Sequence, residues 1–166
     1  MNKPARSLIE GKPALVALDT HKMSFAGIPQ LIEAARRHGV PIVFANDAAT
    51  EMAALSAVRP NEYVIRRRRF SVFYGTELPI LLQELGVSTV ILAGGETSVS
   101  VHYSFVDAHQ YDYFCRVVED CVAGSSPRAH EAALRAMEYM QTGARRQCGE
   151  VIAAFGALRA EAPTAK

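Results

Sequence analysis

The sequence lacks the charge imbalance that would draw a protein to a nucleic acid or to an anionic membrane. Its 166 residues contain 18 Lys and Arg against 17 Asp and Glu, so the formal net charge is +1. A balance this close to neutrality supplies no global electrostatic attraction to polyanions. We therefore expect a small-molecule substrate as partner, with no nucleic acid and no membrane.

Long apolar runs are also missing. The segment 1–12 lacks the run of roughly seven or more apolar residues that a signal peptide carries. No stretch approaches the roughly 20 apolar residues that cross a bilayer. These absences predict a cytoplasmic protein.

Cysteine is scarce, with only Cys115, Cys121 and Cys148. An odd number cannot pair completely in a disulfide framework, and no two of these residues have the C-x-x-C spacing of zinc or redox sites. Isolated cysteines behave mostly as small hydrophobic residues. We predict three free thiols that are buried or half-buried, and no cofactor.

The composition that is present is that of an ordinary globular protein. Apolar residues make up 49% of the chain and charged residues 21%. Because domains average roughly 150 residues, we expect a single domain over 1–166 with its core at about 13–155.

Short apolar runs alternate with amphipathic segments along the chain. Runs of this kind are typical of strands buried on both faces by flanking helices. We expect strands over 13–19, 41–46, 62–66, 88–94, 113–119 and 144–147, and helices over 28–38, 50–58, 77–85, 97–110, 126–140 and 150–159.

This alternation predicts an α/β fold with three layers, α/β/α, around a doubly wound, Rossmann-like, six-stranded and mostly parallel sheet. Ligands of such sheets bind at the carboxyl ends of the strands, beside the switch in strand order. The strands over 13–19 and 88–94 are the expected central pair.

Three stretches at the ends of predicted strands carry polar residues: 15–19, which ends in Asp19, 64–73, which holds four consecutive arginines, and 92–101, which leads into a helix. Together they resemble the isochorismatase-like cysteine hydrolases, a family that includes nicotinamidases, N-carbamoylsarcosine amidases and isochorismatases. Further motifs extend the resemblance from about residue 13 to 155. They are Ser100-Val101-x-x-Ser104-x-x-Asp107-Ala108, Val118-Glu119-Asp120 and Arg69-Phe70-Ser71-x-Phe73-Tyr74-Gly75-Thr76.

The resemblance implies catalytic residues at Asp19, Arg67 and Ser100, where the family has Asp, Lys and a nucleophilic Cys. A serine hydroxyl has almost no anion at neutral pH and needs a matched general base within hydrogen-bond reach. His102 is not expected to be that base, because side chains two residues apart on a helix point away from each other. Ser100 therefore excludes amidase chemistry through a thiol.

Two functional hypotheses remain. In the first, the protein is an isochorismatase-family hydrolase of a small, anionic molecule, acting without a cysteine nucleophile. Asp19 is then the acid and base, Arg67 binds a substrate carboxylate, and Ser100 leaves room or binds water. In the alternative, the protein is a catalytically silent member that serves as a ligand-binding or oligomerising module.

Four further residues are expected to contact the substrate: Gly95, Glu96, His21 and Phe70. The resemblance implies a cis peptide bond between Gly95 and Glu96. Glu96 is bulkier and more acidic than the small residue usual in the family, so it could crowd the pocket, repel anions or pair with an arginine. We expect Arg66–Arg69 to alternate around the strand end, with two side chains solvated and two covering neighbouring surface with their stems. Arg67 is the exception and is expected at the site, and Arg68 or Arg69 could join it in binding a carboxylate.

Asp19-Thr20-His21 has the spacing of an Asp-x-His metal pair. The family's zinc site instead follows the second strand, where this chain has Asn46-Asp47-Ala48-Ala49, and no second histidine is near. We therefore expect no metal. The resemblance also implies a homo-oligomer, a dimer or larger, whose neighbouring subunit could complete the site.

Overall fold

The fold is seen in a computed structural model that describes residues 7–20, 27–47 and 58–158. The strands are β1 (Lys12–Leu18), β2 (Ile42–Asp47), β3 (Tyr63–Arg67), β4 (Val87–Gly95), β5 (Phe114–Ala123) and β6 (Arg145–Arg146). The helices are α1 (Ile28–Arg37), α2 (Leu78–Glu84), α3 (His102–Gln110), α4 (Pro127–Met140) and α5 (Cys148–Ala157), and a π-helical turn, η2 (Thr97–Val101), leads directly into α3. The helix predicted over 50–58 lies, apart from Val58, outside the described residues.

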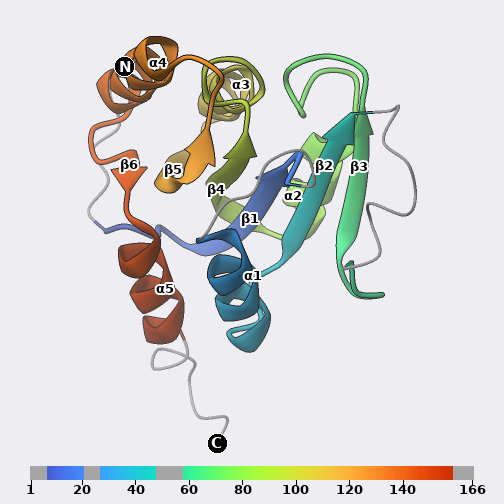
Figure 1. Cartoon of the computed structure of the whole chain (residues 1–166). Helices are drawn as coiled ribbons and strands as arrows, with labels where there is room; N and C mark the ends of the chain where they lie inside the picture. Colours follow the sequence, from blue (N-terminus) through green and yellow to red (C-terminus); the bar gives the residue numbers. More distant parts are fainter. Residues whose placement is uncertain (1–6, 21–26, 48–57, 159–166) are drawn as a thin grey trace, which may run out of the picture.

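The strands form one six-stranded sheet in the order β3-β2-β1-β4-β5-β6 (Figure 1). Every neighbouring pair is parallel, and β1 and β4 are the central pair. The prediction of a doubly wound parallel sheet is confirmed. The order reverses at β1 and β4, so the carboxyl ends of these two strands frame the place where such sheets bind ligands.

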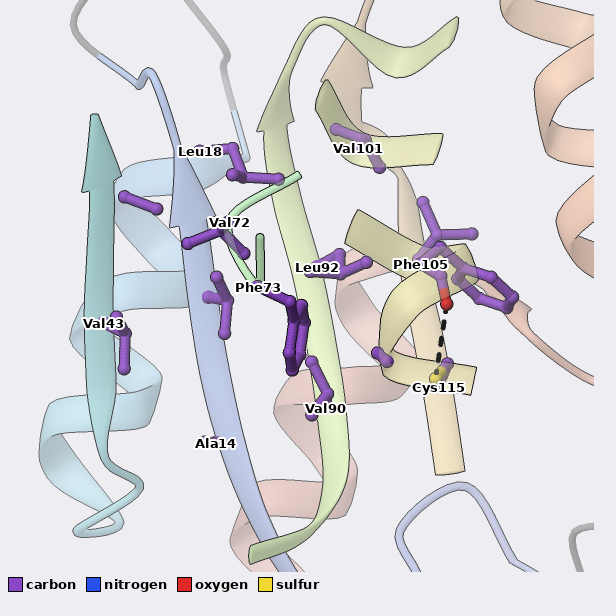
Figure 2. Packing of buried hydrophobic residues seen from close by; sticks show 14 of the residues in the cluster. Ala14, Leu18, Val43, Val72, Phe73, Val90, Leu92, Val101, Phe105 and Cys115 are labelled. Carbon is purple, nitrogen blue, oxygen red and sulfur yellow. Dashed lines mark hydrogen bonds between the residues drawn. The ribbon is translucent and has the colours of Figure 1, made fainter. Parts of the chain in front are cut away.

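Both faces of the sheet are covered, because side chains of successive strand residues point to opposite faces. On β1, Ala14, Val16 and Leu18 contribute to the core beneath α2, α3 and α4, whereas Leu15 and Ala17 contribute to the core beneath α1 and α5. Figure 2 shows the first of these cores, with Leu92 of β4 beside Phe105 of α3. No helix among the described residues is long and apolar enough to cross a membrane.

Most predicted boundaries differ from the structure by one residue, and the larger differences concern β5 and α5. The fifth strand does not stop at Glu119 but continues to Ala123, because the β4–β5 pairing resumes at Gly94↔Val122 after an irregularity in register. The polar residues Glu119 and Asp120 lie at that irregularity, and in the sequence they look like the end of a strand. Helix α5 begins at Cys148, two residues before the predicted start, because Gln147 and Glu150 form a reciprocal capping box.

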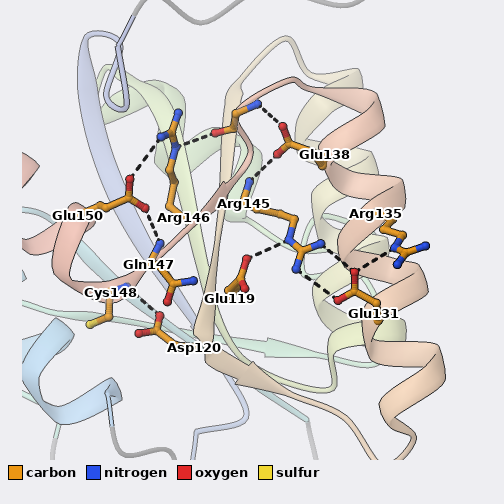
Figure 3. Close-up of polar contacts among 11 residues, drawn as sticks. Glu119, Asp120, Glu131, Arg135, Glu138, Arg145, Arg146, Gln147, Cys148 and Glu150 are labelled. Atoms are coloured by element: carbon orange, nitrogen blue, oxygen red, sulfur yellow. Dashed lines mark hydrogen bonds and ion pairs between the residues drawn. The ribbon is translucent and has the colours of Figure 1, made fainter.

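The short edge strand β6 is held by ion pairs on both sides (Figure 3). Arg145 pairs with Glu119 of β5 at 2.9 Å and with Glu131 of α4 at 3.0 Å. Its neighbour Arg146 pairs with Glu150 of α5 at 3.6 Å. These partly exposed pairs contribute little individually, but together they fix how β6 docks between two helices.

Candidate active site

The site is built at the carboxyl ends of the two central strands. Leu18 of β1 pairs with Gly94 of β4, and the two chains approach so closely that a Cβ on Gly94 would lie 1.9 Å from the Leu18 carbonyl oxygen. Gly94 has φ +108°, a conformation that only glycine adopts readily. Asp19, the residue directly after Leu18, also has a positive φ, of 45°, which an aspartate tolerates. This backbone path places Asp19 at the carboxyl end of the central strand β1.

Asp19 forms a buried ion pair with Arg67, the last residue of β3. Each residue is only 5% exposed. The other Asp19 oxygen, Oδ1, accepts a hydrogen bond of 3.1 Å from the backbone N–H of Asp47, which ends β2 between them. Burial of this kind makes the pair sensitive to loss of one partner, since the remaining charge is left uncompensated.

The Arg67 guanidinium is not fully used by these contacts. Nη2 donates to Asp19, and Nη1 donates to the carbonyl oxygen of Arg69 at 2.9 Å. The buried Nε–H has no hydrogen-bond partner within the part of the chain that the structure describes. An unsatisfied buried donor is costly, so an acceptor that reached this group would be bound favourably.

Ser100 lies in η2, at the head of the helix that follows β4. Its side chain is buried, with 6% exposure, and its hydroxyl has no hydrogen-bond partner among the described residues. Neither nearby histidine serves as its base: His130 contacts Thr97 Oγ1 at 2.9 Å, and His102 stacks edge-on against Tyr103. Burial lowers the pKa of His102. Ser100 therefore lacks the partner that activates a serine nucleophile.

These residues surround one cavity of about 430 Å³, which we call the site cavity. Its described lining residues are Asp19, Asp47, Arg67, Phe70, Gly95, Glu96, Val99 and Ser100. Six of the residues predicted from the sequence are thus brought together. His21 lies outside the described residues.

Two lining residues, Asp47 and Val99, were not predicted as substrate contacts. Asp47 could have been found from its place at the end of a strand beside β1, because parallel strands end at one edge of a sheet. Val99 carries no such signal, since an apolar residue in a predicted helix looks like any core residue.

The peptide bond between Gly95 and Glu96 is cis, as the resemblance implied. The Glu96 side chain turns toward the loop after β5, where Oε1 accepts bonds from the Ser125 N–H at 3.2 Å and the Ser125 hydroxyl at 3.0 Å. Ser98 Oγ donates to the same oxygen at 3.3 Å. No arginine of the described segments pairs with Glu96, so this one of the three possibilities is wrong.

The alternation predicted for the arginine run is only partly seen, because Arg69 is exposed like Arg66 and Arg68. Arg67 is buried at the site, whereas Arg66, Arg68 and Arg69 are exposed. Within the described ranges, no three His, Cys, Asp or Glu residues cluster as metal ligands would.

The three cysteines are free and buried, as predicted, and none lines the site cavity. Burial raises the pKa of the Cys115 thiol to about 12 and raises the pKa of Cys121 and Cys148 as well. A raised pKa keeps a thiol protonated, and the protonated form is not nucleophilic.

We therefore expect iodoacetamide to label the native protein at pH 8 about 100-fold or more slowly than the urea-unfolded protein. Mass spectrometry of timed samples measures both rates. The unfolded chain is the control, in which all three thiols should react. A thiol that reacts as fast in the native protein would contradict the burial described here.

Comparison with known proteins finds relatives in sequence and in fold. The model of the isochorismatase domain family matches residues 12–152. A maleamate amidohydrolase of Pseudomonas putida is 40% identical over 84 residues, which cover 49% of this chain and 39% of that protein. A probable inactive nicotinamidase of Arabidopsis thaliana is 30% identical over 108 residues, or 61% of this chain and 55% of that protein.

The matched stretches thus span about half or less of the length of these curated relatives. An isochorismatase family protein of Burkholderia thailandensis has the same fold, with a TM-score of 0.79 and 21% identity over 89% of this chain and 97% of that chain. With the family model covering most of its length, this chain belongs to the isochorismatase family.

Proposed function

We propose that the protein is a hydrolase of a small molecule that carries a carboxylate, and that it acts without a covalent intermediate on a cysteine or serine. Asp19 exchanges the proton, and Arg67 binds the substrate carboxylate. The observation that carries the proposal is the buried Asp19–Arg67 pair, which lines a cavity of ligand size while leaving one arginine N–H without a partner.

Ser100 stands where the resemblance to the family places the nucleophilic cysteine. It has neither a thiol nor a hydrogen-bonded base among the described residues, which supports a reaction that needs no nucleophile from the protein. Hydrolysis of a vinyl ether is such a reaction. For this role Asp19 takes up a proton as the substrate carboxylate replaces it on Arg67. Asp19 then protonates the terminal alkene carbon, water adds to the resulting oxocarbenium carbon and returns a proton to Asp19, and the hemiketal breaks into a carbonyl compound and an alcohol.

Arg67 supports the choice of a carboxylate substrate. A guanidinium pairs with a carboxylate through two parallel hydrogen bonds, and lysine cannot reproduce that geometry. The relative named maleamate amidohydrolase is also named for a small acid.

The proposal is tested by screening the purified protein against small carboxylates, among them enol ethers, amides and ureido acids. A true ligand raises the melting temperature, because it binds the folded state only. We expect at least one enol-ether acid to stabilise the protein and to be hydrolysed. Stabilisation by none of them would contradict the proposal.

The Ser100→Ala variant separates the two roles of residue 100. If Ser100 only shapes the cavity or binds water, the variant should lower kcat by less than about tenfold, whereas loss of a true nucleophile costs roughly 10³-fold or more. Steady-state kinetics on the substrate found by the screen measures the difference.

A second candidate function is that of a silent, ligand-binding or oligomerising member. The Asp19–Arg67 contact favours it, because two groups that would act on a substrate are bound to each other. One relative is likewise named as a probable inactive nicotinamidase. Stabilisation by a carboxylate that is never converted to product would favour this second function.

A further inference from the structure

Glu96 brings a second polar end to the site cavity. Its carboxylate is fixed through one oxygen only: Oε1 accepts three hydrogen bonds, two from Ser125 and one from Ser98. Gly124 leaves room for the Glu96 side chain, since a Cβ on residue 124 would lie 3.3 Å from Oε1. The other oxygen, Oε2, has no partner in the described part of the chain.

Acidic residues outnumber basic ones among the residues that line the cavity. Its described lining residues include three carboxylates, those of Asp19, Asp47 and Glu96, against the single guanidinium of Arg67. An excess of one sign in a walled cavity disfavours a ligand that carries only that sign. A purely anionic ligand would gain from Arg67 but would be repelled at the Glu96 end.

Arg67 supplies an independent pointer to a ligand. Arg67 is only 5% exposed and lines the same cavity. Its Nε–H has no hydrogen-bond partner among the described residues. Two residues that line one cavity, Arg67 and Glu96, therefore carry an unused donor on a cation and an unused acceptor on an anion. A ligand that matches both carries an acceptor anion and a cationic donor.

We propose that Glu96 determines specificity by binding a protonated amine, so that the preferred ligand is a zwitterion: a carboxylate at Arg67 and an ammonium group at Glu96. This inference rests on the proposed function, which supplies the carboxylate end. Phe70 and Val99 line the same cavity and suit a short hydrocarbon spacer between the two charged groups.

The test uses binding by the full chain, so it needs no turnover. Three sets of ligands are titrated by calorimetry: the ω-amino acids from β-alanine to 6-aminohexanoate, their N-acetyl derivatives, and the acids that lack the nitrogen. The N-acetyl compounds keep an N–H donor but lose the positive charge. In the unaltered protein we expect the best amino acid to bind about tenfold or more tightly than both of its counterparts, because charge-assisted hydrogen bonds are the stronger ones.

The Glu96→Gln variant should abolish this preference. Its amide oxygen can still accept from Ser125, so the loop contact survives, but an NH₂ group then replaces the free oxygen. We expect the Kd of the amino acid to rise about tenfold or more, whereas the Kd of the nitrogen-free acid stays the same or falls. Glu84→Gln, on the exposed side of α2 and outside the cavity lining, is the matched control and should change neither.

Two results would overturn the inference. If Glu96→Gln changes the affinity of all three ligand classes equally, Glu96 repels anions or shapes the cavity and does not select an amine. The proposed function would survive that result, provided the carboxylates still lose affinity in an Arg67→Met variant. If neither protein binds any carboxylate, both the proposed function and this inference fail.

Discussion

Replacing Asp19 with asparagine is expected to lower kcat by about 10²- to 10⁴-fold, the usual contribution of a general acid or base. Asparagine has nearly the same shape and can still accept the hydrogen bond from the Asp47 N–H. It cannot exchange a proton at neutral pH, and it leaves the buried Arg67 without a counter-charge. Steady-state kinetics on the substrate found by the screen measures the loss of rate.

The same variant should also lose stability. Removing one partner of a buried ion pair costs about 3–5 kcal/mol, because the remaining charge stays buried and unpaired. Urea unfolding measures this cost. Asp112→Asn is the matched control: Asp112 also has a positive φ, of 64°, but is exposed, so its variant should stay within about 0.5 kcal/mol of the unaltered protein.

A double variant, Asp19→Asn with Arg67→Met, separates the two effects. Without the guanidinium no buried charge is left unpaired, so part of the stability should return while turnover stays lost. Recovery of turnover in the double variant would argue that Asp19 matters only for holding Arg67.

Gly94→Ala is expected to have the largest effect on folding. The added methyl group would lie 1.9 Å from the Leu18 carbonyl oxygen, a backbone atom of the central strand that cannot move without disturbing the β1–β4 pairing. We expect a loss above about 4 kcal/mol, a large part of the stability of a typical domain. Yield of soluble protein and the urea midpoint measure it.

Gly39→Ala is the control for this variant. Gly39 also has a positive φ, of +67°, but no atom lies within 4 Å of the position of an added Cβ. Only the backbone penalty then applies, about 1 kcal/mol. If the two variants were equally stable, the close approach of β1 and β4 at Gly94 would be wrong.

The sequence predicted the sheet well because apolar runs over 13–19 and 88–94 have few alternatives to buried parallel strands. The position of Asp19 followed from that prediction, since it directly ends the first run. Gly95 and Glu96 followed in the same way from the second. Because β1 and β4 are parallel neighbours, the residues that follow them lie together at the carboxyl ends of the strands.

The contacts between side chains were less predictable. The role expected for Arg67, binding a substrate carboxylate, gave no hint of its ion pair with Asp19, a residue 48 positions earlier, across the end of β2. Likewise, the bonds from Ser125 to Glu96 depend on β5 continuing past an irregularity that the sequence does not reveal. Such contacts depend on the exact path of the backbone and on the reach of long side chains, which periodicity does not specify.

Whether hydrolysis proceeds without an intermediate on the protein can be read directly from the mass of the intact chain, quenched with acid during steady-state turnover of its substrate. An Asp19-catalysed addition of water leaves the protein at its unmodified mass at every time point. A mass increase equal to the acyl or alkyl part of the substrate, located by peptide mapping on Ser100, would contradict the mechanism.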